Sequence, residues 1–332
     1  MKKPSAVRAK VKQMLYGVLG SERVDNVRNS LSFTAKYTFD RELRKRVLGA
    51  IDRRNKNIPI AKDLDLLVEL HNLFPTYDLS DNYIPERLLE TARGRFSQVA
   101  RLGVDLKDKD FMEFGAGHGE NLLVASEFGV KSSLGLDFDD GRFKLLRDKV
   151  STRHATVEYE CLDLVSADIG SQNSDVIMSF SAFEHFDQPG EVLNRCYQSL
   201  RKEGVLYAEF AAFHAPFAIH RKKFCGVPYI QNIFSEETAY EFFYDYLRIN
   251  DEINRYTEKK ITDRNPYPEV NRWCNEDYEN IFLNQEKWRT IKFQKVINYQ
   301  YWWFAKIFER EMKGLSHDDL YRDYLKFVVE KR

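Results

Sequence analysis

The chain has 332 residues, which exceeds one typical domain and fits a single α/β domain with extensions. Hydrophobic residues make up 43% and charged residues 31%, an ordinary globular composition that predicts a sizeable core. Basic and acidic residues balance at 51 each, so the total charge gives no support for a nucleic-acid binder.

The apolar runs and the cysteines predict the compartment. No run approaches the roughly 18 apolar residues of a membrane-spanning helix. The start of the chain, Met1–Pro4, lacks the hydrophobic region of a signal peptide. We expect a cytoplasmic protein. Its 4 cysteines form no close metal-type pair and are expected to be reduced thiols: Cys161, Cys196, Cys225 and Cys274.

Residues 1–60 hold a charge asymmetry that the neutral total conceals. They contain 15 basic and 5 acidic residues, so they carry +10 and the rest of the chain carries −10. Apolar residues within 1–20 recur at helical spacing and predict a basic amphipathic helix. Such a helix can lie on an anionic membrane, at the inner membrane face. The alternative is a solvated helix packed on the rest of the chain.

Two further helices precede the central part of the sequence. Asp63–Leu73 is expected to be one, and Pro75 begins the segment that breaks it. Glu86–Leu102 is expected to be the other, with an apolar stripe along one side. We interpret residues 1–108 as a helical, basic N-terminal extension that caps the following domain.

A glycine-rich stretch at 110–119 follows. The apolar run 111–114 predicts a buried strand, Gly115, Gly117 and Gly119 a tight turn, and residues 120–128 a helix. Such a turn exposes backbone amides and a helix N-terminus to a ligand. A dinucleotide fingerprint requires G-x-G-x-x-G, and here the third glycine comes one residue early.

From Glu113 the stretch instead has the order acidic-x-Gly-x-Gly-x-Gly. This resembles motif I of the class I S-adenosylmethionine-dependent methyltransferases; a purely structural turn is the alternative. The resemblance implies S-adenosylmethionine as cofactor, bound by Glu113 and the three glycines. His118, inside the loop, is expected to contact the methionine end of the cofactor.

The next two strand ends carry acidic residues. Residues 132–136 form a predicted strand that ends at Asp137, where a carboxylate can accept both ribose hydroxyls. Phe138 is expected to pack on the adenine face. Val157–Cys161 is a third predicted strand. The resemblance implies that Asp163 contacts the adenine amino group, with Leu162 against the ring, although Asp163 can also be an ordinary loop aspartate.

The fourth predicted strand, 175–179, leads through Phe180 to Glu184 and His185. This resembles the segment after the fourth strand in the same family, and Phe180 is assigned to the cofactor site. No Asn-Pro-Pro-Tyr or Asp-Pro-Pro-Tyr sequence occurs there, which disfavours methylation of base nitrogens. RNA methylation is therefore an unfavoured alternative.

A helix over 190–201, with Gly204 as its C-cap, and a strand over 205–210 complete the alternating pattern. Five strands alternating with helices predict a Rossmann-like α/β parallel sheet with helices on both faces. We assign residues 109–300 to a methyltransferase domain, with a lid at about 211–275. The lid supplies three substrate candidates: His214, His220 and Tyr229.

The remaining segments are predicted from pattern alone. Ser235 is expected to cap an aromatic helix, and Trp288–Ile297 to form a sixth strand. Residues 301–332 are expected to be a helical tail with a helix over Ser316–Val329, which serves packing rather than chemistry.

Methyl transfer from a sulfonium requires an acceptor atom held in line with the methyl carbon and protected from water. A hydroxyl acceptor benefits from a general base, and His185 is the first candidate because it follows the fourth strand. Glu184 is expected to orient His185 or bind substrate; alternatively, both residues only brace the loop. No group of residues has metal-ligand spacing, so no metal is expected.

The acceptor is predicted less directly. The aromatic, basic lid and the basic N-terminus favour an anionic or carbohydrate acceptor, such as a glycan on a membrane lipid carrier, and we expect O-methylation of a carbohydrate or a related polar acceptor. A small-molecule or quinone-type acceptor is the alternative. A methyltransferase fold retained as a non-catalytic binding module is the third hypothesis.

Overall fold

The computed structural model describes residues 41–56, 58, 61–74, 76, 83–149, 157–171, 173–249, 264–297 and 301–332. The predicted amphipathic helix within 1–20 lies outside these ranges. The chain divides into two compact units. We call Met1–Tyr77, His214–Pro268 and Ile297–Tyr321 the helical unit, and Asp78–Phe213, Glu269–Val296 and Arg322–Arg332 the sheet unit.

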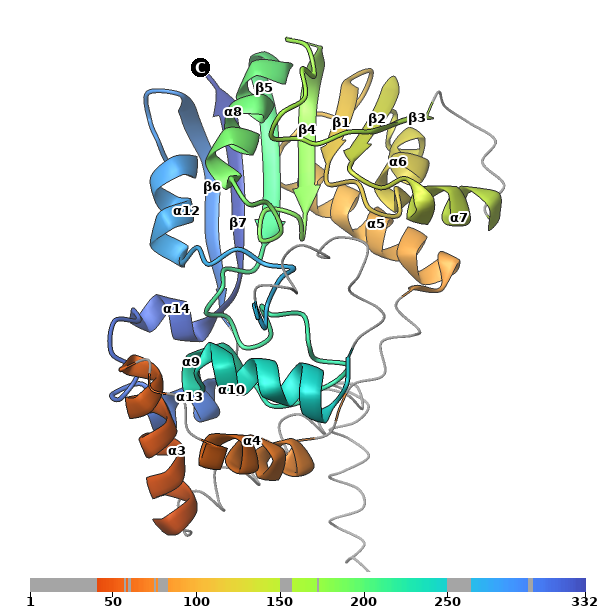
Figure 1. Ribbon diagram of the computed structural model, residues 1–332. Coiled ribbons are helices and arrows are strands. Elements are labelled where there is room, and N and C mark those ends of the chain that lie inside the picture. The colour runs from red at the N-terminus through yellow and green to blue at the C-terminus, as the bar shows by residue number, and fades with distance from the viewer. Residues whose placement is uncertain are drawn as a thin grey trace, which may run out of the picture. The chain divides into compact units, whose positions relative to one another are not determined.

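The sheet unit is built on 7 strands in the order β3-β2-β1-β4-β5-β7-β6 (Figure 1). Neighbouring strands among the first five are parallel, and β7 is antiparallel to β5. The predicted α/β fold is therefore confirmed. The strands are β1 (Asp110–Phe114), β2 (Ser132–Asp137), β3 (Val157–Cys161), β4 (Ser174–Phe180), β5 (Leu200–Phe210), β6 (Trp288–Ile297) and β7 (Arg322–Lys331).

Two hydrophobic clusters cover the two faces of this sheet. One gathers side chains from α5 (Pro85–Arg101), α6 (Glu120–Ala125) and α7 (Gly141–Lys149). The other gathers side chains from α8 (Pro189–Ser199) and α12 (Asn275–Phe282). Parallel strands covered on both faces are expected to be continuously apolar, and the buried runs of β1 and β4 follow that rule. The 3-10 helix η2 (Ser126–Phe128) continues α6.

The predicted helix over Ser316–Val329 is wrong. Residues His317–Tyr321 form the short helix α14, and Arg322–Lys331 form strand β7. Leu325, Phe327 and Val329 face one cluster while Val328 faces the other. A short apolar run buried on both sides does not distinguish a strand from a helix by its periodicity. Residues 322–331 of the predicted helical tail are therefore part of the sheet, and residues 301–321 belong to the helical unit.

Gly204 is not the C-cap of α8. That helix ends at Ser199, and β5 begins at once with Leu200, so Gly204 lies within the strand. A Cβ at Gly204 would stand 2.9 Å from the carbonyl oxygen of Arg201. Glycine is required there because two stretches of backbone come close together.

The helical unit contains α3 (Arg41–Asn55), α4 (Ala61–Leu73), α9 (Ile230–Ile233), α10 (Glu236–Tyr240), the π-helical η3 (Glu241–Tyr246), α13 (Trp302–Phe308) and α14. Its core is aromatic: Phe304 packs on Phe74, Phe308 and Tyr229. The side chain of Ser235 accepts a hydrogen bond from Thr238 N, so its predicted capping role is confirmed. Within the described ranges, no helix is long and apolar enough to cross a membrane.

Candidate functional site

The glycine loop joins β1 to α6, and its three glycines have different roles. All have positive φ: 73° at Gly115, 54° at Gly117 and 71° at Gly119. A Cβ at Gly115 would stand 2.4 Å from Cβ of Ala182, and one at Gly119 would stand 2.4 Å from the ring of Phe143. A Cβ at Gly117 would have no heavy atom within 4 Å. Gly115 and Gly119 therefore allow internal packing, and Gly117 keeps the loop surface open.

Hydrogen bonds hold the loop against the ends of β2 and β3. Asp137 accepts through Oδ2 from Gly117 N at 2.8 Å and through Oδ1 from Phe138 N at 2.8 Å. The Tyr159 hydroxyl donates to the carbonyl oxygen of Gly117 at 3.0 Å. Burial raises the pKa of Asp137, and these backbone donors act in the opposite direction. The predicted loop and the predicted Asp137 site thus lie together.

Glu113 is 2% exposed and stands beneath the loop. Its Oε1 accepts from the side-chain amide of Asn121, and within the described residues Oε2 has no hydrogen-bond partner. Burial, followed by the charge of Glu120, raises the pKa of Glu113 well above its ordinary value. Arg95 pairs with Glu120 at 2.8 Å. An ammonium group that reached Oε2 would satisfy the buried oxygen.

The other predicted cofactor residues border this loop. The His118 ring lies 5.5 Å from the Tyr83 ring, and burial lowers the pKa of His118, which favours the neutral imidazole. Phe138 is 53% exposed directly after β2, so its ring is accessible. Phe180 ends β4, and the guanidinium of Arg95 stands 4.5 Å from its ring centroid.

Leu162 and Asp163 follow β3. The amide of Leu162 donates to the carbonyl oxygen of Asp137 at 2.8 Å, and its side chain is partly buried. Asp163 accepts from Val165 N at 3.0 Å and from the Ser166 hydroxyl at 2.7 Å. Both oxygens of Asp163 thus stabilise the local turn, and a contact with adenine stays a prediction.

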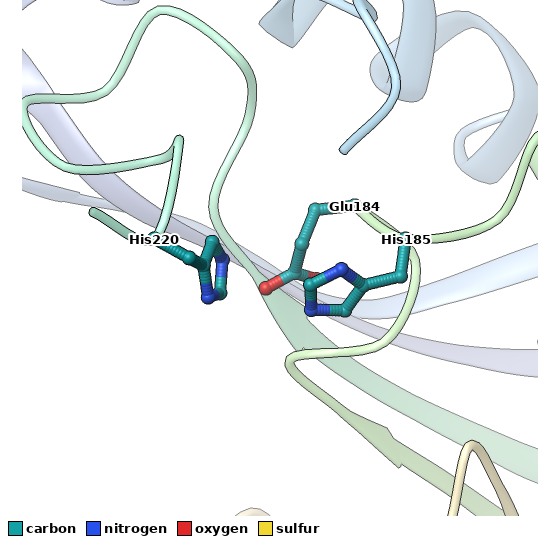
Figure 2. Close-up of side chains that lie close together, drawn as sticks. All are labelled: Glu184, His185 and His220. Atoms are coloured by element: carbon teal, nitrogen blue, oxygen red, sulfur yellow. The ribbon is translucent and has the colours of Figure 1, made fainter. Parts of the chain in front are cut away.

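Glu184 and His185 lie in the loop that follows β4, and Figure 2 shows both side chains on the same side of that loop. A carboxylate oxygen of Glu184 and a ring nitrogen of His185 lie within 4.8 Å. Glu184 is 3% exposed, and burial raises its pKa to about 7, opposed by His185. His185 is exposed, and its Nδ1 lies 2.6 Å from the carbonyl oxygen of Glu269.

That contact fixes the tautomer of His185. A carbonyl oxygen only accepts, so Nδ1 carries a proton, and in the neutral imidazole Nε2 is then the nitrogen with the free lone pair. Asn271 braces the same loop: its side-chain amide donates to the carbonyl oxygens of Phe183 at 2.8 Å and Phe186 at 2.9 Å. The loop after β4 is thus held by a segment more than 80 positions further along the chain.

The three substrate candidates from the predicted lid belong to the helical unit. His214 Nδ1 lies 2.8 Å from the side-chain oxygen of Asn232. His220 is exposed and has a φ of 56°. Tyr229 is fully buried, and its hydroxyl donates to the carbonyl oxygen of Leu320 at 2.7 Å, so packing accounts for it. A substrate role for His214, His220 and Tyr229 stays a prediction.

The sequence pattern did not predict a role at the site for three residues of the sheet unit: Asn121, Tyr159 and Asn271. Asn121 bonds to Glu113, 8 positions earlier, whereas Tyr159 bonds to the carbonyl oxygen of Gly117 and Asn271 to the loop after β4, 42 and 88 positions away. Local patterning contains no signal for such partners. Only the position of Asn121, next to the glycine loop, marked it as a residue near the site.

Comparison with known proteins agrees with these observations. Residues 112–208 match a family described as a methyltransferase domain. The malonyl-[acyl-carrier protein] O-methyltransferase of Acetivibrio thermocellus is 27% identical over 130 residues, which are 37% of this chain. The match spans 45% of the length of that relative.

Solved structures with similar chains are more distant in sequence. An S-adenosylmethionine-dependent methyltransferase from Mesorhizobium loti is 14% identical with a TM-score of 0.45, covering 71% of this chain and 97% of that one. The PH0226 protein of Pyrococcus horikoshii is also 14% identical, with a TM-score of 0.43, covering 72% of this chain and 91% of that one.

Proposed function

We propose that this chain is a class I S-adenosylmethionine-dependent methyltransferase, as the match of residues 112–208 to a methyltransferase domain supports, and that it methylates an oxygen atom of a polar, carbohydrate-like acceptor. The bound cofactor supplies an electrophilic methyl carbon on a positively charged sulfur. The residues of this chain bind that cofactor, orient the acceptor oxygen and remove its proton. The contact between His185 and Glu269 is the observation that carries the proposal.

The cofactor site proposed here is the glycine loop with the ends of β1, β2 and β3. Glu113 offers a buried carboxylate oxygen to the ammonium group, and His118 borders the methionine end. Asp137 retains lone pairs for the ribose hydroxyls, because a carboxylate has about four acceptor positions. Phe138 offers an exposed ring to adenine, and the open space over Gly117 permits close approach of the ligand.

His185 is the proposed general base. Its Nδ1–H donates to the carbonyl oxygen of Glu269, so Nε2 of the neutral imidazole would be placed to take the proton of an acceptor hydroxyl. The side chain is exposed in the loop after β4, at the carboxyl edge of the parallel strands, where ligands of such sheets bind. Glu184, beside it, is proposed to help orient the imidazole.

An oxygen acceptor is also supported by the relative from Acetivibrio thermocellus, which is named an O-methyltransferase. A carbohydrate, such as a glycan on a lipid carrier, is favoured by the basic sequence of residues 1–60, which suits an anionic membrane surface. Small acceptors, including quinone-type molecules and malonyl thioesters, are the alternatives. Transfer of labelled methyl groups to extracted lipid-linked glycans, compared with these small acceptors, discriminates between them.

Calorimetry with S-adenosylmethionine tests the cofactor site. The wild-type chain is expected to bind, and Asp137→Ala to bind at least about tenfold more weakly, because hydrogen bonds to a charged group are lost. Asp168→Ala is the control: Asp168, an exposed residue between β3 and β4, also accepts a hydrogen bond from a local amide, Gly170 N at 3.0 Å. Equal binding by all three proteins would refute the assignment. No binding by wild type would favour a non-catalytic module.

His185→Asn tests the base separately. The variant is expected to bind the cofactor as wild type does, because Asn can still donate to the Glu269 carbonyl. Its kcat with an accepted hydroxyl substrate is expected to fall by about 100-fold or more, since general-base catalysis contributes typically that much. Full activity in this variant would remove His185 from the mechanism without affecting the cofactor assignment.

A further inference from the structure

Strands β4, β5 and β7 bring three side chains into one row near the carboxyl ends of β4 and β5. Phe180 is the Cα partner of Glu209 across the parallel pair β4–β5, and Glu209 is the partner of Lys326 across the antiparallel pair β5–β7. Paired residues point to the same face of a sheet. The row therefore begins at Phe180, next to the glycine loop, and extends over two further strands.

Glu209 and Lys326 form an ion pair that remains accessible. The ammonium of Lys326 lies 2.8 Å from Oε2 of Glu209, and the buried hydroxyl of Tyr207 donates to the same oxygen at 2.7 Å. The two charged side chains are 16% and 22% exposed. Within the described residues, Lys326 and Tyr207 both contact Oε2 of Glu209. Oε1 is therefore available to accept a hydrogen bond from a ligand. Lys326 likewise keeps donors beyond the one it gives to Glu209.

Tyr324 adds an aromatic surface beside this pair. It lies two residues before Lys326 in β7, so the alternation of the strand turns both to one face. Its side chain is 38% exposed. Desolvation raises the pKa of Tyr324, followed by the charge of the neighbouring Asp323 and the smaller effects of Glu184 and Glu209, while Arg95 opposes them.

The spacing of the strands suits a second substrate. Glu113 of β1 pairs with Met178 of β4, and β5 is the next strand. Neighbouring strands are about 4.8 Å apart, so β5 lies about 10 Å from β1. An acceptor over β5 and β7 would therefore stand beside, not within, a cofactor held over the ends of β1, β2 and β3.

We propose that Glu209, Lys326 and Tyr324 form the acceptor-binding subsite, and that it recognises the hydroxyl groups and apolar ring face of a neutral carbohydrate. The inference rests on the proposed methyltransferase function and adds its substrate-binding residues. Carboxylate Oε1 accepts from one hydroxyl, the ammonium donates to another, and the Tyr324 ring packs on the C–H face of the sugar. A few polar groups beside an aromatic side chain are typical of small-ligand sites.

Charge balance at this edge favours a neutral acceptor over an anion. Lys326 is already paired with Glu209, and Arg95 is paired with Glu120. A carboxylate or phosphate placed here would have to compete with a protein carboxylate for its cation, whereas a polyol needs no unpaired charge.

Saturation-transfer NMR titrations with methyl glycosides of glucose, galactose, mannose and rhamnose test this subsite, with S-adenosylhomocysteine present and malonate as the anionic probe. At least one glycoside is expected to bind wild type, and malonate is not. Glu209→Gln and Lys326→Met are expected to weaken that binding by about tenfold. Both variants are expected to bind S-adenosylmethionine as wild type does.

Lys295→Met is the matched control, because Lys295 pairs with Glu279 at 2.7 Å with similar exposure, 21% and 24%, on β6 and α12. It is expected to bind glycosides normally. Wild type that binds S-adenosylmethionine but no glycoside, binding of malonate instead, or equal loss in all three variants would overturn the subsite. Wild type that fails to bind S-adenosylmethionine would overturn the proposed function, and this inference with it.

Discussion

A buried carboxyl group at position 184 makes the stability of the protein depend on pH. Burial raises the pKa of Glu184 to about 7 from an ordinary value of 4.5. Below about pH 4.5 the group is protonated in both the folded and the unfolded chain. As the pH rises towards 7 the unfolded chain ionises first, so the free energy of unfolding falls, and above that value the loss is complete.

Glu184→Gln removes this titration. The free energy of unfolding of the variant minus that of wild type is expected to increase by up to about 3 kcal/mol as the pH rises from about 5 to about 8. Each pKa unit is worth about 1.4 kcal/mol. Urea unfolding of both full chains at the two pH values measures the difference. A constant difference between variant and wild type across this range would show that Glu184 titrates normally.

The three glycines mark how far individual residues can be predicted from the sequence. Their spacing predicted a ligand loop, and all three do adopt positive φ. The sequence could not separate Gly117, which faces open space, from Gly115 and Gly119, whose missing side chains make room for Ala182 and Phe143. Those neighbours come from later elements, so their positions depend on tertiary packing.

At the scale of elements, the predictions hold where the pattern is repeated and fail where it is short. The strands β1, β2, β4 and β5 follow apolar runs, β3 follows its β-branched and aromatic content, and the helix predicted over Glu86–Leu102 is α5. The tail over Arg322–Lys331 has equally apolar residues but neither a glycine nor a proline to mark a strand. Its pairing with β5, more than 100 positions earlier, decides its structure.

This pairing also explains why the acceptor subsite was not predicted. Glu209 was placed at the end of the fifth strand, but Lys326 and Tyr324 were assigned to a helix that serves packing. Antiparallel register alone brings Lys326 opposite Glu209. The cofactor loop is local in sequence, since β1, its turn and α6 are consecutive, and it is therefore the part of the site that the sequence predicts well.

At the scale of the whole molecule, charge is divided unevenly along a neutral chain. Residues 1–60 contain 15 basic and 5 acidic residues, which gives +10 against −10 for the remainder. The sequence within 1–20 also places apolar residues at helical spacing. An amphipathic basic segment binds anionic membranes through both its apolar side and its charge.

The full chain is therefore expected to sediment with liposomes that contain phosphatidylglycerol and much less with pure phosphatidylcholine liposomes. Deletion of residues 1–20 is expected to abolish this binding, and Lys10→Gln with Lys12→Gln to weaken it. Raising the salt concentration shortens the range of the attraction, to about 3 Å at 1 M, so binding should fall with ionic strength. S-adenosylmethionine affinity, measured on the deleted chain, should stay unchanged. Equal sedimentation of the full and deleted chains would show that residues 1–20 do not bind the membrane. It would remove the support for a membrane-bound acceptor and favour a small acceptor in solution.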